Sequence, residues 1–293
     1  MTLTQLQIFI CVAEFRNFTL AAKQLNISQS AVSHALKILE QQWQVTLFAR
    51  EHHQIQLTYV GERLLQYAKE LLNTQNMMQQ EIAALRGVQH GILRIGSFGA
   101  SSSIHLLPEL LQAYRQHYPN IEIYVEEGTD YEVAQMILEK RVDVGFSVLP
   151  QPKLHTFPLI TDIFVALIPN SYPIATQTQI HLTDLKDYPF ILTKAGSQTH
   201  VEALLKKYQI YPKIKYQLSQ ILTILNMVNL QEGVSIVADM AITAELLTLH
   251  PNVVKRPLMP NTQRHIGLAV RSEKAMSPAT QAFITLAQKI FTE

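Results

Sequence analysis

The sequence contains a single cysteine and almost no net charge. Cys11 alone cannot form an intrachain disulfide among the 293 residues. It lies on an apolar helical stripe, which favours a small core residue, and a redox sensor is the alternative. The formal net charge of +1 excludes a chain that is basic throughout. Any contact with nucleic acid must therefore come from a local surface.

Long apolar runs are missing as well. No stretch is long and apolar enough to span a membrane. The N-terminus lacks a basic start, and Gln5, Gln7 and Glu14 interrupt its apolar pattern, so a secretion signal is not expected. We therefore expect a cytoplasmic protein. Because 47% of the residues are hydrophobic and no low-complexity tract interrupts them, the chain has room for about two or three compact domains.

Reactive constellations are not found either. No cluster of cysteine and histidine has the spacing of metal ligands, and no serine lies in a nucleophile elbow. The Gly96–Gly99 segment is only a weak approximation to a phosphate-binding glycine loop. The paired carboxylates Glu126 and Glu127 would point to opposite faces of a strand. We therefore expect no enzyme activity, no cofactor and no metal site.

Residues 18–61 carry the strongest local pattern in the chain. Two apolar periodicities of helical spacing are joined by a tight turn and followed by a short, partly basic, strand-like segment. An amphipathic helix precedes them, which allows three helices to share one core. Asn26 stands where the turn requires a left-handed backbone. Ser28 is the predicted N-cap of the third helix, and the second helix is expected to start near Thr19.

The polar face of the third helix predicts contact with DNA. Gln29 can pair with an adenine edge through two hydrogen bonds, and the short polar side chains beside it bury almost nothing, as a helix in the major groove requires. Cationic side chains on this helix and on the hairpin after it can meet phosphates. An ordinary solvated face is the alternative, although glutamate and lysine would favour a helix more there. The predicted DNA-binding residues are Gln29, Ser30, Ser33, His34, Lys37, Arg50, His52 and His53.

A continuous helical pattern follows, from the predicted N-cap Thr58 to about Arg86. Apolar residues recur in it at alternating steps of four and three, the spacing of a coiled-coil seam. A helix packed on its own domain is the alternative. Because residues 1–60 carry few cations, one copy would bind DNA weakly, and we expect a dimer. The predicted dimerisation seam consists of Leu64, Ala68, Leu71, Gln75, Met78, Ile82 and Leu85.

Beyond Gly87 and Gly91, strands alternate with helices, which predicts parallel sheets covered by helices. Two such runs, within 92–148 and 190–237, indicate an α/β fold with two subdomains and a cleft between them. The chain is expected to cross between the subdomains near 164–168 and 266–270. The predicted domains are a DNA-binding head (1–60), a linker helix (58–87) and a ligand-binding domain (91–293) with subdomains 91–164 plus 266–293 and 165–265.

Hydroxyl side chains gather where these strands are predicted to end. Open α/β sheets bind ligands at the carboxyl ends of their strands. Hydroxyls and backbone N–H groups at a helix start can hold a carboxylate or another anion. Each of these residues taken singly is equally well explained as a helix cap, so the prediction depends on the whole set. The set is Ser97, Ser101, Ser102, Thr129, Ser147, Thr193 and Ser197.

Short segments along the whole chain match the signature of a known family. The specific matches are Ala21–Ala22, Leu25, Ser28–Gln29, Ala31–Ser33, Leu39–Glu40, Leu47–Phe48, Arg50, Leu57–Thr58 and Gly61. Looser matches follow at Leu106–Pro108, Tyr118–Pro119, Asp143–Gly145 and Tyr172–Pro173. In these segments the chain resembles the LysR-type transcriptional regulators. It departs from them at Ser30, where the family most often has proline, and at Trp43 and Gln44, where it has a leucine-glycine pair.

The resemblance implies a winged helix-turn-helix, a linker helix that pairs with its partner's, and an effector domain folded like a type 2 periplasmic binding protein. It implies a transcriptional regulator that binds a pseudo-palindromic operator in double-stranded DNA as a dimer or a dimer of dimers and responds to a small-molecule effector. Two other classes remain open. A solute-binding protein would leave the first ninety or so residues without a use, and an enzyme on the same scaffold would need a reactive constellation in the cleft.

Overall fold

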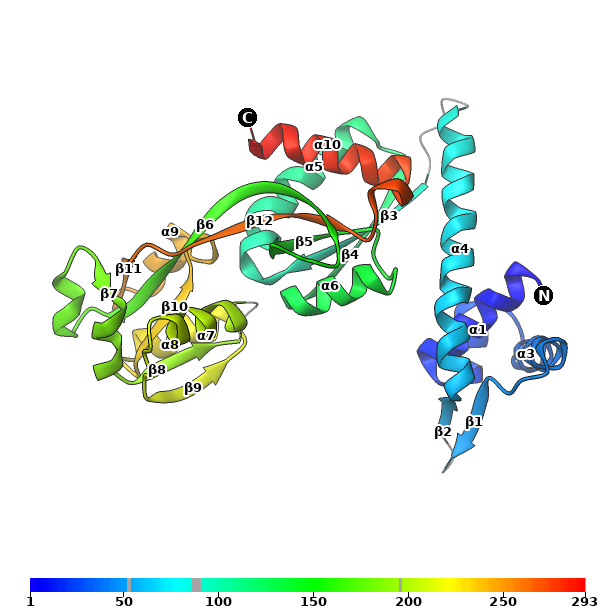
Figure 1. The fold of residues 1–293 in the computed structure, drawn as a ribbon, viewed down its shortest axis with the longest axis horizontal. Helices are drawn as coiled ribbons and strands as arrows, with labels where there is room; N and C mark the ends of the chain where they lie inside the picture. Colours follow the sequence, from blue (N-terminus) through cyan, green and yellow to red (C-terminus); the bar gives the residue numbers. More distant parts are fainter. Residues whose placement is uncertain (52–53, 86–90, 195–196, 293) are drawn as a thin grey trace. The chain divides into compact units, whose positions relative to one another are not determined.

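The computed structural model describes residues 1–51, 54–85, 91–194 and 197–292. The chain folds as two compact units, residues 1–88 and 89–293, and each is described by itself (Figure 1). Within the described ranges, no helix has both the length and the apolar character needed to cross a membrane.

The first unit consists of four helices and a two-stranded hairpin. Its elements are α1 (Leu3–Phe15), α2 (Phe18–Gln24), α3 (Gln29–Trp43), β1 (Phe48–Glu51), β2 (Gln54–Leu57) and α4 (Tyr59–Leu85). The two strands pair antiparallel. The first three helices and the base of α4 enclose one apolar core, because each presents one apolar face to the others. The fully buried side chains of this core include Leu6, Phe9, Val12, Val32, Leu39 and Leu47.

Local contacts confirm the predicted turn and caps of this unit. Asn26 has a φ of 53°, in the left-handed region, and Ser28 Oγ accepts a hydrogen bond from the backbone N–H of Ala31 at 3.1 Å. Thr58 Oγ1 accepts one from the N–H of Gly61 at 3.0 Å, which confirms it as the cap of α4. The second helix starts at Phe18, the neighbour of Thr19, as predicted, and Asn17 caps it.

Gly61 marks a close approach between α4 and the segment before the hairpin. A Cβ atom at this position would lie 2.3 Å from the carbonyl oxygen of Leu47. That oxygen also accepts the N–H of Thr58 at 2.9 Å. Only glycine permits this contact without a shift of the backbone, so residue 61 fixes where α4 begins against the head.

The predicted dimerisation seam divides into two parts along α4. Ala68 is 2% exposed and Leu64 packs beside it, and both belong to the head core. At these two residues α4 packs on its own domain, which is the alternative to a dimer seam. Leu71, Met78 and Ile82 are exposed. Gln75 is half-buried. The side chain of Leu85, the last residue of the seam, is not among those described.

The second unit is built on a twisted mixed sheet in the order β4-β3-β5-β12-β6-β10-β8-β9, with β11 beside β6 and β7 beside β11. Its strands are β3 (Gly91–Phe98), β4 (Ile121–Gly128), β5 (Val144–Leu149), β6 (His155–Pro169), β7 (Ile180–His181), β8 (Phe190–Thr193), β9 (Ile214–Leu218), β10 (Val234–Ala238), β11 (Val253–Met259) and β12 (Gln263–Val270).

Two long strands join the halves of this sheet. Residues 155–163 of β6 pair antiparallel with β12, whereas residues 164–169 pair antiparallel with β10 and β11. The outer strands pair in parallel, as predicted, in β4-β3-β5 and in β10-β8-β9. The sheet is antiparallel at its centre, because the two predicted crossing segments themselves become strands.

Helices cover both halves of the sheet. A π-helical turn (Ser101–Leu106), α5 (Leu107–His117), α6 (Asp130–Leu138) and α10 (Pro278–Thr292) belong to the first half. In the second half lie α7 (Gln198–Lys207), α8 (Ile221–Asn229) and α9 (Ala244–Thr248). Figure 1 shows α5 and α10 on one side of the sheet and α6 on the other.

The cores follow this division. One apolar cluster fills the first half, around Phe146, Tyr114 and Phe283. In the second half, alternate residues of β6 face opposite sides of the sheet, as the pleat requires. Phe164, Ala166 and Ile168 enter one cluster, whereas Val165 and Leu167 enter another. The two halves therefore have separate cores and meet where β6 and β12 cross.

Candidate functional site

The outer face of α3 presents a polar surface. Gln29, Ser30, His34 and Lys37 are exposed, and Ser33 is half-exposed. The inner face of the same helix is apolar, with Val32, Leu36 and Leu39 at most 3% exposed. The structure therefore brings the five predicted residues of α3 together on one surface.

Hydrogen bonds between neighbouring side chains fix the orientations of the residues on this surface. Gln29 Nε2 donates to Ser33 Oγ at 3.0 Å, and the hydroxyls of Ser28 and Ser30 lie 2.9 Å apart. All four side chains come from the start of α3 and its cap. Because these bonds are open to water, base edges can replace them at little cost.

The hairpin after α3 is fixed to the helical core. Leu47 donates its backbone N–H to Glu40 Oε1 at 2.6 Å, and the ring of Phe48 packs edge-on against Phe9 at 5.7 Å between centroids. Arg50 lies in β1 opposite Ile55 in β2. The side chain of Arg50 and both histidines predicted for DNA contact, His52 and His53, lie outside the described residues.

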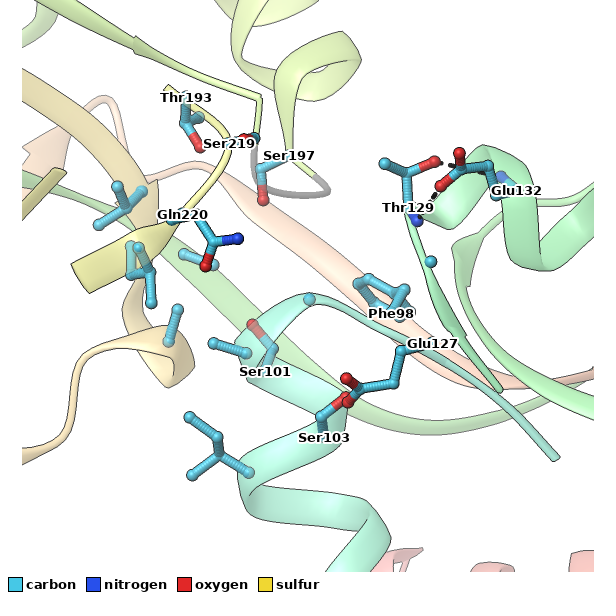
Figure 2. Close-up of a pocket in the computed structure, with 18 of the residues that line it drawn as sticks. Phe98, Ser101, Ser103, Glu127, Thr129, Glu132, Thr193, Ser197, Ser219 and Gln220 are labelled. Atoms are coloured by element: carbon cyan, nitrogen blue, oxygen red, sulfur yellow. Dashed lines mark hydrogen bonds between the residues drawn. The ribbon is translucent and has the colours of Figure 1, made fainter. Parts of the chain in front are cut away.

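The second unit contains a cavity of about 450 Å³ between the two halves of the sheet (Figure 2). The start of the π-helical turn, the end of β4 and the N-terminal end of α6 form one wall. The other wall comes from the residues after β8 and β9 and from β10. Strand ends and helix starts therefore converge on it, as expected for an open α/β sheet. Its polar lining is Ser101, Ser103, Glu127, Thr129, Glu132, Thr193, Ser197, Ser219, Gln220 and Arg264.

Four of the seven predicted ligand contacts line this cavity, namely Ser101, Thr129, Thr193 and Ser197. Three are buried in its supporting wall instead. The hydroxyl of Ser97 lies 3.0 Å from that of Ser102, which donates to the carbonyl oxygen of Phe98. Ser147 donates to Asp130 Oδ1 at 2.8 Å. Ser97, Ser102 and Ser147 do not line this cavity, and each of their hydroxyls is hydrogen-bonded within the protein.

Thr129 also serves as a helix cap. Its hydroxyl accepts the backbone N–H of Glu132 at 3.2 Å, and Glu132 Oε2 accepts the N–H of Thr129 at 2.7 Å. These hydrogen bonds hold the pKa of the Glu132 carboxyl below its usual value. The Glu132 carboxylate therefore caps the N-terminus of α6, although it borders the cavity.

Arg264 is the main residue that the sequence pattern missed. It lies on β12 directly opposite Asp162 on β6. Its Nε and Nη2 both donate to Asp162 Oδ2, at 3.0 and 2.7 Å. The two side chains are 2% and 1% exposed. A charged pair buried this deeply needs hydrogen bonds on all sides, and Asp162 Oδ1 accepts the N–H groups of Ile163 and Met240.

The remaining contacts of Arg264 reach both walls of the cavity. Nη2 donates to Ser101 Oγ at 2.6 Å, and Nη1 donates to Ser197 Oγ at 3.2 Å. The guanidinium carbon lies 5.9 Å from the ring centroid of Phe98 and 5.5 Å from that of Phe164. Two aromatic rings and four hydrogen bonds thus fix its orientation. A lone arginine beside an apolar crossing strand was the available signal, since such a charge requires a partner.

A second cavity of about 550 Å³ borders α6 and the start of α7. It is lined in part by Asp130, Tyr131, Lys153 and His200. Burial lowers the pKa of His200, while the Asp130 carboxylate partly opposes that shift and Arg264 adds to it. Across the described ranges, no group of three or more histidine, cysteine, aspartate or glutamate side chains could hold a metal ion.

Comparisons with known proteins match both units. Residues 3–62 match the family described as bacterial regulatory helix-turn-helix protein, lysR family, and residues 86–291 match the LysR substrate binding domain. YvbU, an uncharacterized HTH-type transcriptional regulator of Bacillus subtilis (strain 168), is 30% identical over 292 residues, which cover 99% of each chain. LrrA, a probable HTH-type transcriptional regulator of Synechococcus elongatus, is 32% identical over 296 residues, covering 100% of this chain and 98% of LrrA.

A solved structure has the same fold. A full-length OxyR variant from Pseudomonas aeruginosa superposes with a TM-score of 0.77 at 26% identity, covering 99% of this chain and 94% of that chain. These matches confirm the resemblance seen in the sequence and the fold that it implies, in both units. The chain belongs to the LysR family of DNA-binding transcriptional regulators, whose members combine a helix-turn-helix head with an effector-binding domain and are regulators rather than enzymes.

Proposed function

We propose that α3 reads base edges in the major groove of an operator. The observation that carries this proposal is the exposed polar surface of α3 above a fully apolar inner face. Glutamine and serine at the start of such a helix offer the donor and acceptor pairs that distinguish base pairs. In this proposal the base contacts come from Gln29, Ser30, Ser33 and His34, and the phosphate contacts from Lys37, Arg50, His52 and His53.

Two copies of the chain act together in this proposal. A single head carries few cations, and the exposed side chains of Leu71, Met78 and Ile82 leave an apolar stripe along the second half of α4. Pairing of two such stripes would bury them. Two α3 helices would then enter successive major grooves of a pseudo-palindromic site, about 34 Å apart. A dimer of dimers extends the same arrangement along the DNA.

A small-molecule effector bound in the 450 Å³ cavity controls the DNA contact in this proposal. The cavity lies between two halves with separate cores, so that closing it can change the angle between them. The functional divisions that we propose are residues 1–60 for DNA binding, 58–87 for the linker helix and 91–293 for effector binding, with subdomains 91–164 plus 266–293 and 165–265. Because its target is chromosomal DNA, we place the protein in the cytoplasm.

The reading helix can be tested with a single substitution. Gln29→Ala should cost about 1–3 kcal/mol against the preferred operator and little against random DNA, since base contacts specify and phosphate contacts do not. Fluorescence anisotropy with DNA from beside the encoding gene measures both affinities. Gln7→Ala, which removes an exposed glutamine from α1, is the matched control and should change neither. Equal losses on both DNAs would reduce Gln29 to a positioning role.

The effector can be tested without knowing its identity. A broad metabolite library should contain a compound that raises the thermal unfolding temperature of the full chain and changes its footprint on the operator. If every compound leaves both the unfolding temperature and the footprint unchanged, the effector part of the proposal fails while the DNA-reading part stands.

A further inference from the structure

The hydroxyls of Ser101 and Ser197 have a fixed hydrogen-bonding sense. Ser101 belongs to the first half of the second unit and Ser197 to the second half, and Figure 2 shows their oxygen atoms facing one another across the cavity. Both accept a hydrogen bond from the guanidinium of Arg264. Arginine has donors only, so these bonds occupy an oxygen lone pair of each serine and leave each O–H proton to point elsewhere.

The cavity is the open space to which those two protons can turn, since both residues line it. Within the part of the chain that the structure describes, neither hydroxyl donates to a protein acceptor. The two residues are 3% and 5% exposed, and both line the cavity. Buried donors without an acceptor are costly, which means that the site favours a ligand group that accepts two hydrogen bonds.

The charges around the cavity define the rest of the ligand. Asp162 offsets the charge of Arg264, but that carboxylate lies on the far strand β6 and is fully hydrogen-bonded. Glu127 also lines the cavity, and its carboxylate can only accept hydrogen bonds. The Glu127 carboxylate would repel a second carboxylate on the ligand, whereas it would stabilise a hydroxyl or an ammonium group.

From these contacts we propose that Arg264 is a positioning residue that makes Ser101 and Ser197 a pair of donors for one carboxylate of the effector, and that the effector is a hydroxy acid or an amino acid. The carboxylate would bridge the two halves through one serine from each. Arg264 acts through the serines, since Asp162 and the two aromatic rings hold its guanidinium in place. The proposal rests on the effector site proposed above and names the chemistry of that site.

Matched pairs of probes test the ligand class. The full-length protein would be titrated by calorimetry with small hydroxy acids and amino acids, such as lactate, shikimate and alanine, and with the primary amide of each. An amide has nearly the same shape, but it replaces one acceptor oxygen with a donor. We expect a carboxylate to bind at least about tenfold more tightly than its amide. The proposal is overturned if no carboxylate binds, or if amides or dicarboxylates bind as well.

Substitutions then separate positioning from folding. Ser101→Ala and Ser197→Ala should each weaken the carboxylate by about tenfold to a hundredfold and leave the amide much less affected. Ser101→Thr keeps a hydroxyl and should retain the preference. Arg264→Lys keeps the charge but loses the planar fork, so the ratio of the two affinities should fall towards one. Ser272→Ala, at an exposed serine, is the matched control.

The ratio of carboxylate to amide affinity is the decisive quantity, because a merely structural defect would weaken both ligands equally. Unchanged ratios in Ser101→Ala and Ser197→Ala would overturn the proposal even if Arg264→Lys fails to fold. Operator binding and footprints of the same proteins distinguish a failure of this proposal from a failure of the proposed effector function. If an uncharged compound changes the wild-type footprint, the effector function stands and only its proposed chemistry fails.

Discussion

The surface of α3 and the cavity of the second unit use similar side chains in opposite ways. On α3, Gln29 bonds to Ser33 within one exposed helix, and water competes for every contact. In the cavity, Ser101 and Ser197 come from different halves and are held by one buried guanidinium. Exposure therefore decides the role of a hydroxyl in this chain. Exposed ones can adapt to different base edges, whereas buried ones are fixed for a single type of ligand group.

The first prediction tests how strongly the cavity depends on its buried charge pair. Asp162→Asn leaves the charge of Arg264 without its counterion, and loss of one partner of such a pair costs about 3–5 kcal/mol. Urea unfolding of the full chain should show this loss in the transition of the second unit. Asp187→Asn, at an exposed aspartate, is the control. A loss below about 1 kcal/mol would show that the pair contributes little to the fold.

How much could be predicted from the sequence differs between the two regions. The α3 surface follows from local periodicity, since Val32, Leu36 and Leu39 define the inner face and so the outer one. The strands at 190–193 and 214–218 lie within the run predicted over 190–237, because short apolar segments between turns define them. These features depend only on residues close together in the chain.

The cavity was predicted only in part, because its central contact is not local. Arg264 meets Asp162 across a pairing of β12 and β6 that joins residues 102 positions apart. No periodicity encodes the register of two antiparallel strands so far apart. The same limit explains why the pattern did not separate Ser97 and Ser147 from the serines that line the cavity, since a strand-end serine looks alike in sequence in both places.

A second prediction concerns the exposed stripe on α4. Met78 is 61% exposed, and its burial in a dimer would contribute about 1.5–3 kcal/mol. Met78→Glu should therefore raise the dimer dissociation constant by about tenfold or more and weaken operator binding in parallel. Sedimentation velocity measures the first effect. Gln79→Glu, on the neighbouring exposed position, should leave the dimer intact. A Met78→Glu protein that dimerises normally would place the interface elsewhere.

A smaller effect is expected at the cationic edge of the α3 surface. Lys37 is exposed, and Lys37→Gln should remove about one phosphate contact per head. Affinity would then fall about equally for the operator and for random DNA, and the slope of log affinity against log salt would decrease by about one per head. Lys206→Gln in the second unit is the control. An unchanged salt slope would remove Lys37 from the DNA contact.

The smallest effect concerns the pH dependence of the second unit. Burial holds the pKa of His200 below its ordinary value of 6.5, with Asp130 opposing and Arg264 reinforcing the shift. A lowered folded pKa means that the unfolded chain binds the proton more tightly. The stability is therefore complete above pH 6.5 and is lost as the pH falls through the folded pKa.

His200→Gln removes this titration, so the stability of the second unit should decline less as the pH falls below 6.5. Urea unfolding on both sides of that value measures the difference. His117→Gln replaces an exposed histidine and should keep the wild-type profile. If His200→Gln declines as steeply as the wild type, the buried imidazole does not determine the acid sensitivity.

The most direct test joins the two regions in one molecule. A ligand that binds the cavity would be added to the full chain on its operator, and the footprint would be compared between the wild type and Ser101→Ala. We predict that the ligand changes the wild-type footprint, whereas Ser101→Ala binds the operator with unchanged affinity and shows no change at the same ligand concentration. Loss of operator binding by Ser101→Ala without ligand, or an unaltered wild-type footprint at saturating ligand, would contradict the coupling between the cavity and the DNA-reading helix.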